Sequence, residues 1–389
     1  MSKNIKEKII IFLLILIPVL LFVFSYFWID YGLFLMVADG HPFLNHFKEI
    51  IPFRDSHRPI LANVYLVLLL ALFGLQIFLL FTKRFKFLSV KKLFLVAGIA
   101  TFFFSLAYPF LSRDLFTYLF SAKMVLFYHV NPFVTPPMNY LSTDLWVGMA
   151  RNIQFPYAYG PTSLVYSLIP MIFFSGKRFI LNFLGYKLMN AVLFYLAGFL
   201  LYKINDRDKK VFAFWFFNPF LIMELLVNAH NDLLMIGLFI ISVYFLFKEK
   251  RVKAWLFFIT SVLTKYASAV ALPVMFLGKK NKPLYFKLLS LFSIIFLLVQ
   301  KIRYVLGWYY TWLYMFLPLA KLKIQSWVLI SMIGMLFLID YYPFVKWGFW
   351  GATPLIPHSK WLFFFFLALI IIIELDLPNL RKKIKSFAK

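Results

Sequence analysis

The sequence predicts an all-α protein, a polytopic membrane helical bundle, and three observations support this fold class. The 389 residues are 63% hydrophobic and only 14% charged, whereas soluble domains are roughly 45–50% apolar and about 25% charged. Apolar runs recur along the whole chain, and several are long enough to cross about 30 Å of hydrocarbon. Lys and Arg gather in short segments between these runs. An ordinary soluble enzyme, a signal peptide with a soluble body and a single-span anchor are therefore excluded.

The apolar runs predict roughly 10–13 membrane segments by hydropathy, some of them re-entrant. The five clearest cover residues 9–28, 61–81, 93–111, 180–202 and 254–277. Shorter runs cover 162–174, 211–227, 233–247, 288–299, 305–319, 327–339 and 361–373. The basic segments between them cannot all lie on one side of the membrane if every run crosses once. We therefore expect re-entrant breaks near Asn218 and Pro219 and near Thr264 and Lys265, because broken helices are tolerated where they line a protein cavity.

The placement of Lys and Arg predicts the sidedness of the chain and divides it into three regions. Basic residues precede the first span, separate the second from the third and close the chain. We therefore expect both termini in the cytoplasm and the protein in the plasma (cytoplasmic) membrane. Residues 1–82 then form a transmembrane hairpin with an external loop, and residues 83–320 a core with a long extracytoplasmic loop at 112–161. Residues 321–389 form the C-terminal membrane helices and a basic cytoplasmic tail.

The net charge of +26 reflects 41 Lys and Arg against 15 Asp and Glu. Because these cations sit between apolar runs, the positive-inside rule and anionic lipid headgroups explain them better than nucleic acid does. Membrane lipids are therefore expected partners, and nucleic acid is not. The chain has no cysteine, which removes disulfides, thiolate metal sites and a cysteine nucleophile. Any catalysis must then use carboxylates, histidines, hydroxyls or groups of the substrate.

The few acidic residues allow the candidate bases to be found by elimination. Six lie beside basic segments or in the tail and are interpreted as solvated or headgroup-level charges: Glu7, Asp206, Asp208, Glu249, Glu374 and Asp376. Six lie in the two external loops: Asp30, Asp39, Glu49, Asp55, Asp114 and Asp144. Three lie within or at the edge of apolar stretches: Glu224, Asp232 and Asp340. An ionisable residue in a membrane segment is costly and is by default a functional candidate.

The first cluster begins where the third span ends, at Arg113 and Asp114, and continues through Tyr118 to Asn131. A carboxylate at this interface could accept a proton from a substrate hydroxyl while Arg113 meets a phosphate, and an interfacial helix could guide a lipid-linked substrate. The alternative is that Arg113 and Asp114 only cap a span at headgroup level. Tyr159, downstream in the same loop, fits an aromatic interface belt without any function.

A second cluster combines Glu224, Asn228, His230 and Asp232 with a cation at Lys265. Glu224, Asn228 and Asp232 are spaced by one helical turn, so they share one face. Lys265 either reaches the interface, pairs with a carboxylate or receives an anionic group. We expect no metal here, because no second histidine is near and Mg²⁺ or Mn²⁺ would take several oxygen ligands.

A third cluster joins Arg303 to an aromatic group that begins at Trp308. An arginine suits bidentate phosphate contacts, and a tryptophan can stack on a sugar ring. An aromatic belt at the interface is the alternative.

Short motifs follow one another in order between Leu93 and Leu319. They are Ser112-Arg113-Asp114 with Tyr118, Asn131-Pro132-Phe133, Tyr159-Gly160-Pro161, Asn218-Pro219 followed by His230-Asn231-Asp232, Leu263-Thr264-Lys265 with Pro273, and Trp308-Tyr309 with Trp312. In this order the set resembles the GT-C superfamily of integral-membrane glycosyltransferases. It is most similar to the polyprenol-phosphate-mannose-dependent α-1,6-mannosyltransferases of bacteria and archaea.

The resemblance implies that residues 83–320 are a GT-C catalytic core with interfacial helices in the 112–161 loop. It implies transfer of a hexose, mannose by inheritance, from a polyprenyl-phosphate-sugar donor to a glycan or glycolipid acceptor on the extracytoplasmic face. Asp114 matches the general base of an inverting reaction. Two spans precede Leu93, whereas the catalytic acid of many GT-C enzymes follows the first span, so Asp30 and Asp39 remain alternatives.

The remaining site residues are assigned to the donor and the acceptor. Cations that can stabilise the leaving phosphate without an obligatory metal are Arg113, Lys265 and Arg303. Residues expected to bind substrate are Tyr118, Asn131, Tyr159, His230, Asp232 and Trp308. No cofactor is expected.

Two other classes of membrane protein remain as alternatives. A transporter or flippase of a lipid-linked substrate would also combine many spans with buried charges, but it is expected to show repeat symmetry, which this sequence lacks. An acyltransferase or an oligosaccharide polymerase is the other class, and an acyltransferase would require a histidine base at membrane depth, where His230 is the candidate.

Overall fold

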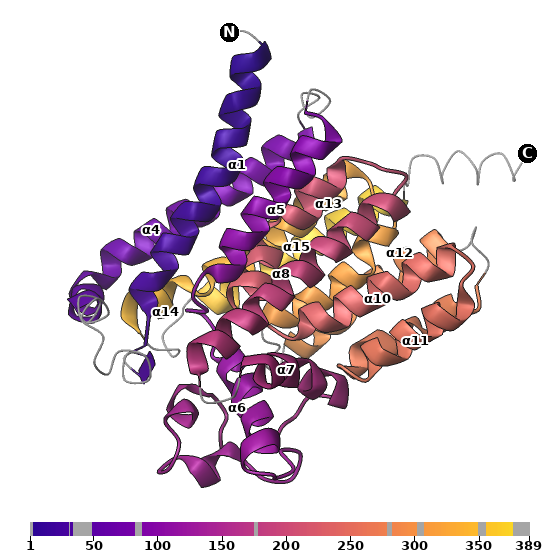
Figure 1. The fold of residues 1–389 in the computed structure, drawn as a ribbon. Coiled ribbons are helices and arrows are strands. Elements are labelled where there is room, and N and C mark those ends of the chain that lie inside the picture. The colour runs from indigo at the N-terminus through magenta and orange to yellow at the C-terminus, as the bar shows by residue number, and fades with distance from the viewer. Residues whose placement is uncertain are drawn as a thin grey trace, which may run out of the picture.

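The computed structural model describes residues 3–30, 32–33, 49–81, 88–174, 178–277, 282–301, 307–348 and 355–375. Helices account for the regular structure of these residues, and the described part of the chain contains no strand. The predicted all-α class is therefore confirmed. The helices pack into a bundle, and the segment around α6 and α7 forms a lobe at one end of it (Figure 1).

Four segments of the described chain are long and apolar enough to cross a membrane: Glu7–Trp28, Ile50–Phe81, Phe179–Ile204 and Ile324–Trp347. They comprise α1 (Lys3–Ser25) with the 3-10 helix η1 (Tyr26–Trp28), α4 (Ile50–Phe81), α8 (Phe179–Ile204), and α13 (Ile324–Ile339) with α14 (Tyr342–Trp347). At about 1.5 Å per residue, helices of this length match the hydrocarbon thickness. α4 is kinked at His57, two residues before Pro59, which cannot donate to the helix.

The other α-helices are shorter or follow breaks in the chain. They are α5 (Val90–Leu106), α6 (Asp114–Phe127), α7 (Pro161–Phe174), α9 (Pro219–Leu221), α10 (Asp232–Phe247), α11 (Arg251–Val262), α12 (Lys282–Lys301) and α15 (Leu355–Leu375). The 3-10 helices are η4 (Pro137–Tyr140), η5 (Leu145–Met149), η8 (Tyr266–Met275), η9 (Gly307–Met315) and η10 (Leu317–Leu319). Two π-helices, η6 (Phe212–Phe216) and η7 (Ile222–Val227), flank α9.

The membrane segments differ from the sequence prediction in their continuity and in the number of full-length spans among the described residues. Residues 254–277 are not one continuous span, because α11 ends at Val262 and the chain continues as η8 after an extended Lys265. The break expected at Thr264 and Lys265 lies there. The sequence predicts roughly 10–13 membrane segments. Among the described residues, four segments are full-length candidates, and a fifth is added if the bent helix pair Pro219–Val227 and Asp232–Phe247 forms one span; the other apolar helices are shorter.

The sharpest break of the bundle follows η7. The chain bends by 111° between Pro219–Val227 and Asp232–Phe247, so a run that reads as two apolar segments is a broken helix. Upstream, the Asn218 side chain accepts from the backbone N–H groups of Phe220 and Leu221 and starts α9, with Pro219 at its first position. Irregular backbone at this depth is stable only where protein surrounds it, and residues 218–232 are all buried.

The contacts of α8 show which basic segments share one end of the bundle. α8 begins beside α6, where the ring of Phe179 stacks on that of Phe116 at 6.0 Å between centroids. It ends at the 205–210 loop, in which the Lys209 Nζ donates to the backbone oxygen of Leu88, two residues before α5, at 2.7 Å. The Lys203–Lys210 run therefore lies at the same end of the bundle as Lys91 and Lys92. The lobe around α6 lies at the opposite end (Figure 1).

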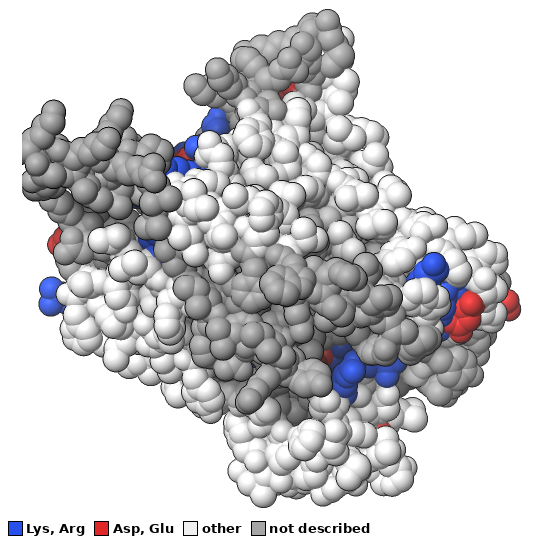
Figure 2. Space-filling model, turned by 180° about the vertical axis from the view of Figure 1, so that it is seen from behind, with Lys and Arg blue, Asp and Glu red and all other residues white. Residues whose placement is uncertain are grey.

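The outer surface agrees with a membrane setting. On the face shown in Figure 2, the described residues are mostly uncharged, and Lys, Arg, Asp and Glu gather in a few small groups. Large apolar side chains on the lipid-facing sides of the helices are exposed, for example Val67 on α4 at 63% and Val192 on α8 at 69%. An exposed apolar surface of this extent is typical of protein that is solvated by lipid.

Candidate active site

Asp114 opens α6 at the point where the chain leaves α5. Its backbone N–H donates to the Ser112 hydroxyl at 3.2 Å, and its carboxylate lies in the first helical turn, where the helix dipole favours negative charge. The Tyr159 hydroxyl donates to the Asp114 Oδ2 at 3.3 Å, and the Tyr118 hydroxyl lies 3.5 Å from the same oxygen. The side chain of Asp114 is 17% exposed. The carboxylate is therefore held from several sides but stays accessible.

His230 lies between two carboxylates. Its Nδ1 is 3.3 Å from the Asp114 Oδ2, and its Nε2 is 3.2 Å from the Glu224 Oε2. These are close ion-pair contacts, without the alignment of a hydrogen bond. The imidazole is almost fully buried and stacks on Trp308, with 5.4 Å between ring centroids. Asp114, His230 and Glu224 thus form a continuous array from the accessible carboxylate into the protein interior.

The broken helix places His230 in this array. Ala229, immediately before it, has a φ of 55°, a left-handed conformation that a residue with a Cβ adopts only at a cost. The surrounding contacts outweigh this cost. The Asn228 side chain donates to the Glu224 Oε2 at 3.2 Å, and the Tyr341 hydroxyl donates to the Glu224 Oε1 at 3.1 Å. Glu224 is therefore held by groups from two elements while it faces the histidine.

The charge of Asp114 follows from these neighbours. Burial raises the pKa of this carboxyl group, whereas the contact with His230, the positive charges of His230 and Lys265, and the Tyr159 hydroxyl lower it. The lowering causes dominate, so the pKa of Asp114 lies below its ordinary value. The group is therefore an ionised carboxylate at neutral pH, the state in which it can accept a proton.

A second buried charge pair lies beside the first array. The Lys265 Nζ donates to the Asp232 Oδ2 at 2.8 Å, and the Trp312 Nε1 donates to the Asp232 Oδ1 at 2.5 Å. Asp232 is fully buried and Lys265 is 12% exposed. The ammonium group also lies 5.0 Å from the centre of the Tyr159 ring, the same residue that contacts Asp114. Of the three possibilities for Lys265, the structure shows pairing with a carboxylate, and Tyr159 joins the two arrays.

Asn231 connects the broken helix to the start of α7. Its side-chain nitrogen donates to the Ser163 hydroxyl at 2.9 Å, and that hydroxyl also contacts the Tyr157 hydroxyl at 2.8 Å. The backbone N–H of Asn231 lies 3.5 Å from the Tyr118 hydroxyl. The side-chain oxygens of Asn231 and Asn228 are buried without a hydrogen-bond partner among the described residues. Two acceptors are therefore left next to the His230 array.

Gly160 allows the 112–161 loop to meet the break between α11 and η8. Its backbone N–H donates to the Thr264 oxygen at 3.1 Å, and the Thr162 N–H donates to the Leu263 oxygen at 3.2 Å. A Cβ at position 160 would lie 1.9 Å from the Leu263 oxygen, which no side chain could accommodate. The glycine is therefore required by a close backbone approach that brings Tyr159 and Lys265 together.

Several residues of the expected site lie elsewhere. Arg113 forms an ion pair with Asp30 at 2.6 Å and is 47% exposed, so a role at the donor phosphate would require it to leave that partner. Asp30 also accepts from the Tyr108 hydroxyl at 2.8 Å. The Asn131 Oδ1 accepts from the Phe133 backbone N–H at 3.0 Å and closes a turn. Arg303 and Asp39 lie outside the described residues.

The sequence analysis did not identify every residue and contact that builds the site. Glu224 and His230 were both candidates, but the contact between them was not predicted. Lys187 on α8 was not singled out. It is fully buried, and its Nζ donates to the backbone oxygens of Leu226 and Val227 at 2.6 and 2.7 Å. A lysine inside an apolar span was the available signal, and its contacts support the last turn of η7 before the break.

In the part of the chain that is described, no group of three or more His, Asp and Glu side chains is arranged to hold a metal ion. Asp232 faces a lysine and a tryptophan, and Asp114 faces a histidine and tyrosines. That the protein works without a metal stays a prediction.

Comparison with known proteins identifies a family. The model of the MptA/B family, described as alpha-(1->6)-mannopyranosyltransferase, N-terminal domain, matches residues 34–278. No curated protein and no solved structure matches this chain. The matched residues cover more than half of the chain and include Asp114, Tyr159, His230, Asp232 and Lys265. The resemblance read from the motifs is thereby confirmed, and the chain belongs to the MptA/B family of alpha-(1->6)-mannopyranosyltransferases.

Proposed function

We propose that this membrane glycosyltransferase moves a mannosyl residue from a polyprenyl-phosphate-linked donor to a hydroxyl group of a glycan or glycolipid acceptor. The reaction is of GT-C type and inverts the anomeric configuration. Family membership supports the sugar and the reaction class. The observation that carries the proposal is the ionised, partly accessible Asp114 carboxylate, held by Tyr159 and backed by His230 and Glu224.

Asp114 acts as the general base in this proposal. As the acceptor oxygen attacks C1 of the mannosyl group, the Asp114 carboxylate takes the proton of that hydroxyl group. The bond between C1 and the phosphate oxygen breaks, and its electron pair leaves with the polyprenyl phosphate. Attack and departure occur on opposite faces of the sugar, so the product has the inverted configuration. His230 keeps the carboxylate oriented and charged, and Glu224 holds His230.

Negative charge grows on the leaving phosphate in the same step. Lys265 is the lysine of the two arrays that can meet this charge, because its ammonium lies 5.0 Å from the centre of the Tyr159 ring beside the base. The ammonium has three donors, and Asp232 occupies one of them. A fixed cation in a water-poor site stabilises such charge strongly. The aromatic faces of Tyr159 and Trp308 lie beside the base and are suited to contact the sugar ring.

The proposed orientation places the site on the extracytoplasmic face. Asp114 and the 112–161 loop lie at the opposite end of the bundle from the basic segments at Lys91–Lys92 and Lys203–Lys210. Basic segments favour the cytoplasmic side. The polyprenyl chain of the donor then stays in the bilayer while its sugar reaches the start of α6.

Transfer in proteoliposomes tests the proposed donor. We expect radiolabelled mannose to pass from polyprenyl-phosphate-mannose to an oligomannoside or glycolipid acceptor, and no transfer from a nucleotide-linked mannose. Nuclear magnetic resonance of the product should show the inverted anomer. Transfer from the nucleotide sugar alone would contradict the lipid donor, and movement of the lipid-linked sugar across the bilayer without transfer would favour a flippase.

A further inference from the structure

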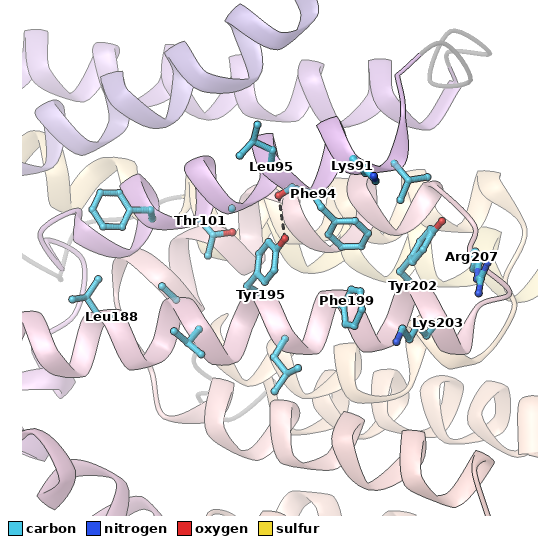
Figure 3. A pocket seen from close by; sticks show the side chains of 16 residues that line it. Lys91, Phe94, Leu95, Thr101, Leu188, Tyr195, Phe199, Tyr202, Lys203 and Arg207 are labelled. Atoms are coloured by element: carbon cyan, nitrogen blue, oxygen red, sulfur yellow. Dashed lines mark hydrogen bonds between the residues drawn. The ribbon is translucent and has the colours of Figure 1, made fainter.

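A long groove lies on the outside of the bundle between α5 and α8, away from the site described above. Its volume is 1340 Å³. The side chains that line it repeat every three or four residues on each helix, so each helix contributes one stripe. The lining residues are Val90, Lys91, Phe94, Leu95, Gly98, Thr101, Phe102, Leu188, Ala191, Val192, Tyr195, Leu196, Phe199, Tyr202, Lys203 and Arg207. Figure 3 shows the two stripes facing each other.

The walls and floor of the groove suit a hydrocarbon chain. Phe94 forms the floor, with its ring 5.4 Å from that of Phe199 and 5.3 Å from that of Tyr202. Its backbone oxygen accepts from the Tyr195 hydroxyl at 3.2 Å, which fixes the two helices against each other. Between Val90 and Phe102, α5 rises by about 18 Å at 1.5 Å per residue, a length that matches a long acyl chain.

One end of the groove is basic. Figure 3 shows Lys91, Lys203 and Arg207 together at that end. No carboxylate of the described residues lies within ion-pair distance of these three cations. Three acidic residues at this end of the bundle form ion pairs with other cations: Glu7 with Lys92, Asp206 with Lys321, and Asp208 with Lys210. Three cations without an ion-pair partner among the described residues thus lie at the mouth of an apolar groove, and the Lys203 ammonium rests over the Phe199 ring at 4.4 Å.

The basic end is remote from the reacting groups. Lys91 lies in the first turn of α5, and Asp114 follows the end of that helix, whose 17 residues span about 25 Å. A lipid whose phosphate contacts Lys91, Lys203 and Arg207 therefore has its headgroup too far from Asp114 to be the reacting donor. The groove calls for a different lipid, with its headgroup at the opposite membrane surface.

We propose that this groove binds an anionic phospholipid of the phosphatidylglycerol type, from the leaflet opposite to the active site. Its phosphate contacts Lys91, Lys203 and Arg207, and one acyl chain lies along Phe94, Tyr195 and Val192. Charge complementarity selects this occupant, because a zwitterionic lipid would place a cationic group beside the three basic side chains. Each basic residue near a membrane surface strengthens the binding of anionic lipid about fivefold.

Native mass spectrometry of the purified full-length protein tests the headgroup contacts. The protein is titrated with palmitoyl-oleoyl phosphatidylglycerol and, in parallel, with the corresponding phosphatidylcholine. We expect the protein to retain phosphatidylglycerol in preference to phosphatidylcholine. In the K91Q/K203Q/R207Q variant this preference should fall by on the order of 100-fold. The matched control is K250Q/R251Q/K253Q. It removes three exposed positive charges that follow the C-terminal end of α10, the end away from Asp232. Equal preference in the first variant and the wild type would overturn the proposal.

A second pair of variants tests the acyl-chain groove without changing charge. Val192→Trp fills the groove from an exposed position on α8, and Val67→Trp places the same side chain on the exposed face of α4. We expect Val192→Trp to weaken retention of phosphatidylglycerol at least tenfold, and Val67→Trp to leave it unchanged. Equal retention by the two variants would contradict the proposed groove.

Competition decides between anionic lipids. If undecaprenyl phosphate displaced equimolar phosphatidylglycerol completely, the groove would belong to a carrier lipid and the proposal would be wrong. These measurements report binding and not sugar transfer, so their failure leaves the proposed transfer reaction unaffected.

Discussion

Asp114 combines two properties that a base for a hydroxyl group needs. It is ionised because His230, Lys265 and Tyr159 lower its pKa against the effect of burial, and it remains 17% exposed. The rarity of ionisable residues in and beside apolar segments made His230, Asp232 and Lys265 candidates from the sequence, and Asp114 became one by elimination among the few acidic residues and by the family resemblance. Their pairing was not predictable, because Lys265 meets Asp232 across 33 positions and His230 meets Asp114 across more than 100. Such contacts depend on how the helices pack.

Replacing His230 by Gln should shift the pH dependence of transfer. Asp114 loses its charge as the pH falls through its pKa, which in the wild type lies below the ordinary value of about 3.9. Without His230, burial still raises this pKa but its main opposing cause is gone. We expect the acidic limb of the kcat profile to move to higher pH and kcat at neutral pH to fall.

The control for this prediction is His57→Gln, because the His57 ring contacts Ser56 and Phe53 instead of the site. An acidic limb at the same pH in His230→Gln and wild type would contradict the assigned contact. Complete loss of activity at every pH, with normal folding, would instead favour His230 itself as the base.

The Lys265–Asp232 pair permits a test that separates stability from donor binding. Lys265→Met leaves the buried Asp232 charge unpaired, which should cost about 3–5 kcal/mol of folding free energy. In Lys265→Met/Asp232→Asn the charge is also removed, so we expect the Tm to recover in part. The KM for the lipid donor should stay raised, because the cation at the leaving phosphate is absent.

The matched pair is Lys123–Asp144, which is similarly buried within the segment 112–161. Lys123→Met/Asp144→Asn should change the Tm and leave the donor KM at the wild-type value. A wild-type KM in the Lys265→Met/Asp232→Asn variant would show that Lys265 serves the fold alone.

At the scale of elements, the site is built from helix ends and breaks. Asp114 starts α6, Asp232 starts α10, and Lys265 lies between α11 and η8. Hydropathy predicted the break at Thr264 and Lys265 but read 254–277 as one of the clearest spans, because composition does not record a short interruption. The break at Asn218 was visible from its proline. The 111° bend after η7 was not, because Ala229 is an ordinary helix former held in a left-handed conformation.

Gly160→Ala tests whether the loop and the α11–η8 break must touch. The added Cβ would meet the Leu263 oxygen at 1.9 Å, so the two backbone hydrogen bonds at this contact should break. We expect a loss of about 1–3 kcal/mol in stability and a fall in kcat, since Tyr159 and Lys265 separate. Thermal unfolding and initial transfer rates measure both effects.

Gly148→Ala is the control, because a Cβ at that position of the same loop meets nothing within 4 Å. Its stability should stay within about 0.5 kcal/mol of the wild type. Equal behaviour of the two alanine variants would mean that the Gly160 contact does not hold the site.

For the whole molecule, composition was sufficient to predict the all-α membrane class but not the number of complete spans. Many apolar runs are half-length pieces, such as η7 and η8, that lie beside the site instead of crossing the bilayer alone. The sequence left open which basic segments lie on the same side of the membrane. The structure answers this for the Lys203–Lys210 segment, because Lys209 lies against Leu88, next to Lys91 and Lys92 at the start of α5. Both basic segments therefore lie at the end of the bundle opposite to Asp114.

The absence of cysteine makes the sidedness of the whole molecule directly measurable. Single cysteines at Ser142, Lys210 and Lys250, all exposed positions, can be labelled with a membrane-impermeant maleimide on intact cells. We expect labelling at Ser142 without permeabilisation, and labelling at Lys210 and Lys250 only after it, because these two lie at the basic end. Labelling of Ser142 and Lys210 from the same side would contradict the proposed topology.

The most direct measurement compares two acidic residues near the same interface. Asp114→Asn and Asp30→Asn are each assayed for mannosyl transfer from polyprenyl-phosphate-mannose in proteoliposomes, with folding checked by thermal unfolding. Asp30 is engaged by Arg113 and Tyr108, whereas Asp114 is backed by His230. We expect kcat to fall about 10²–10⁴-fold in Asp114→Asn and to stay close to wild type in Asp30→Asn. Full activity of Asp114→Asn, or an equal loss in a folded Asp30→Asn, would contradict Asp114 as the base.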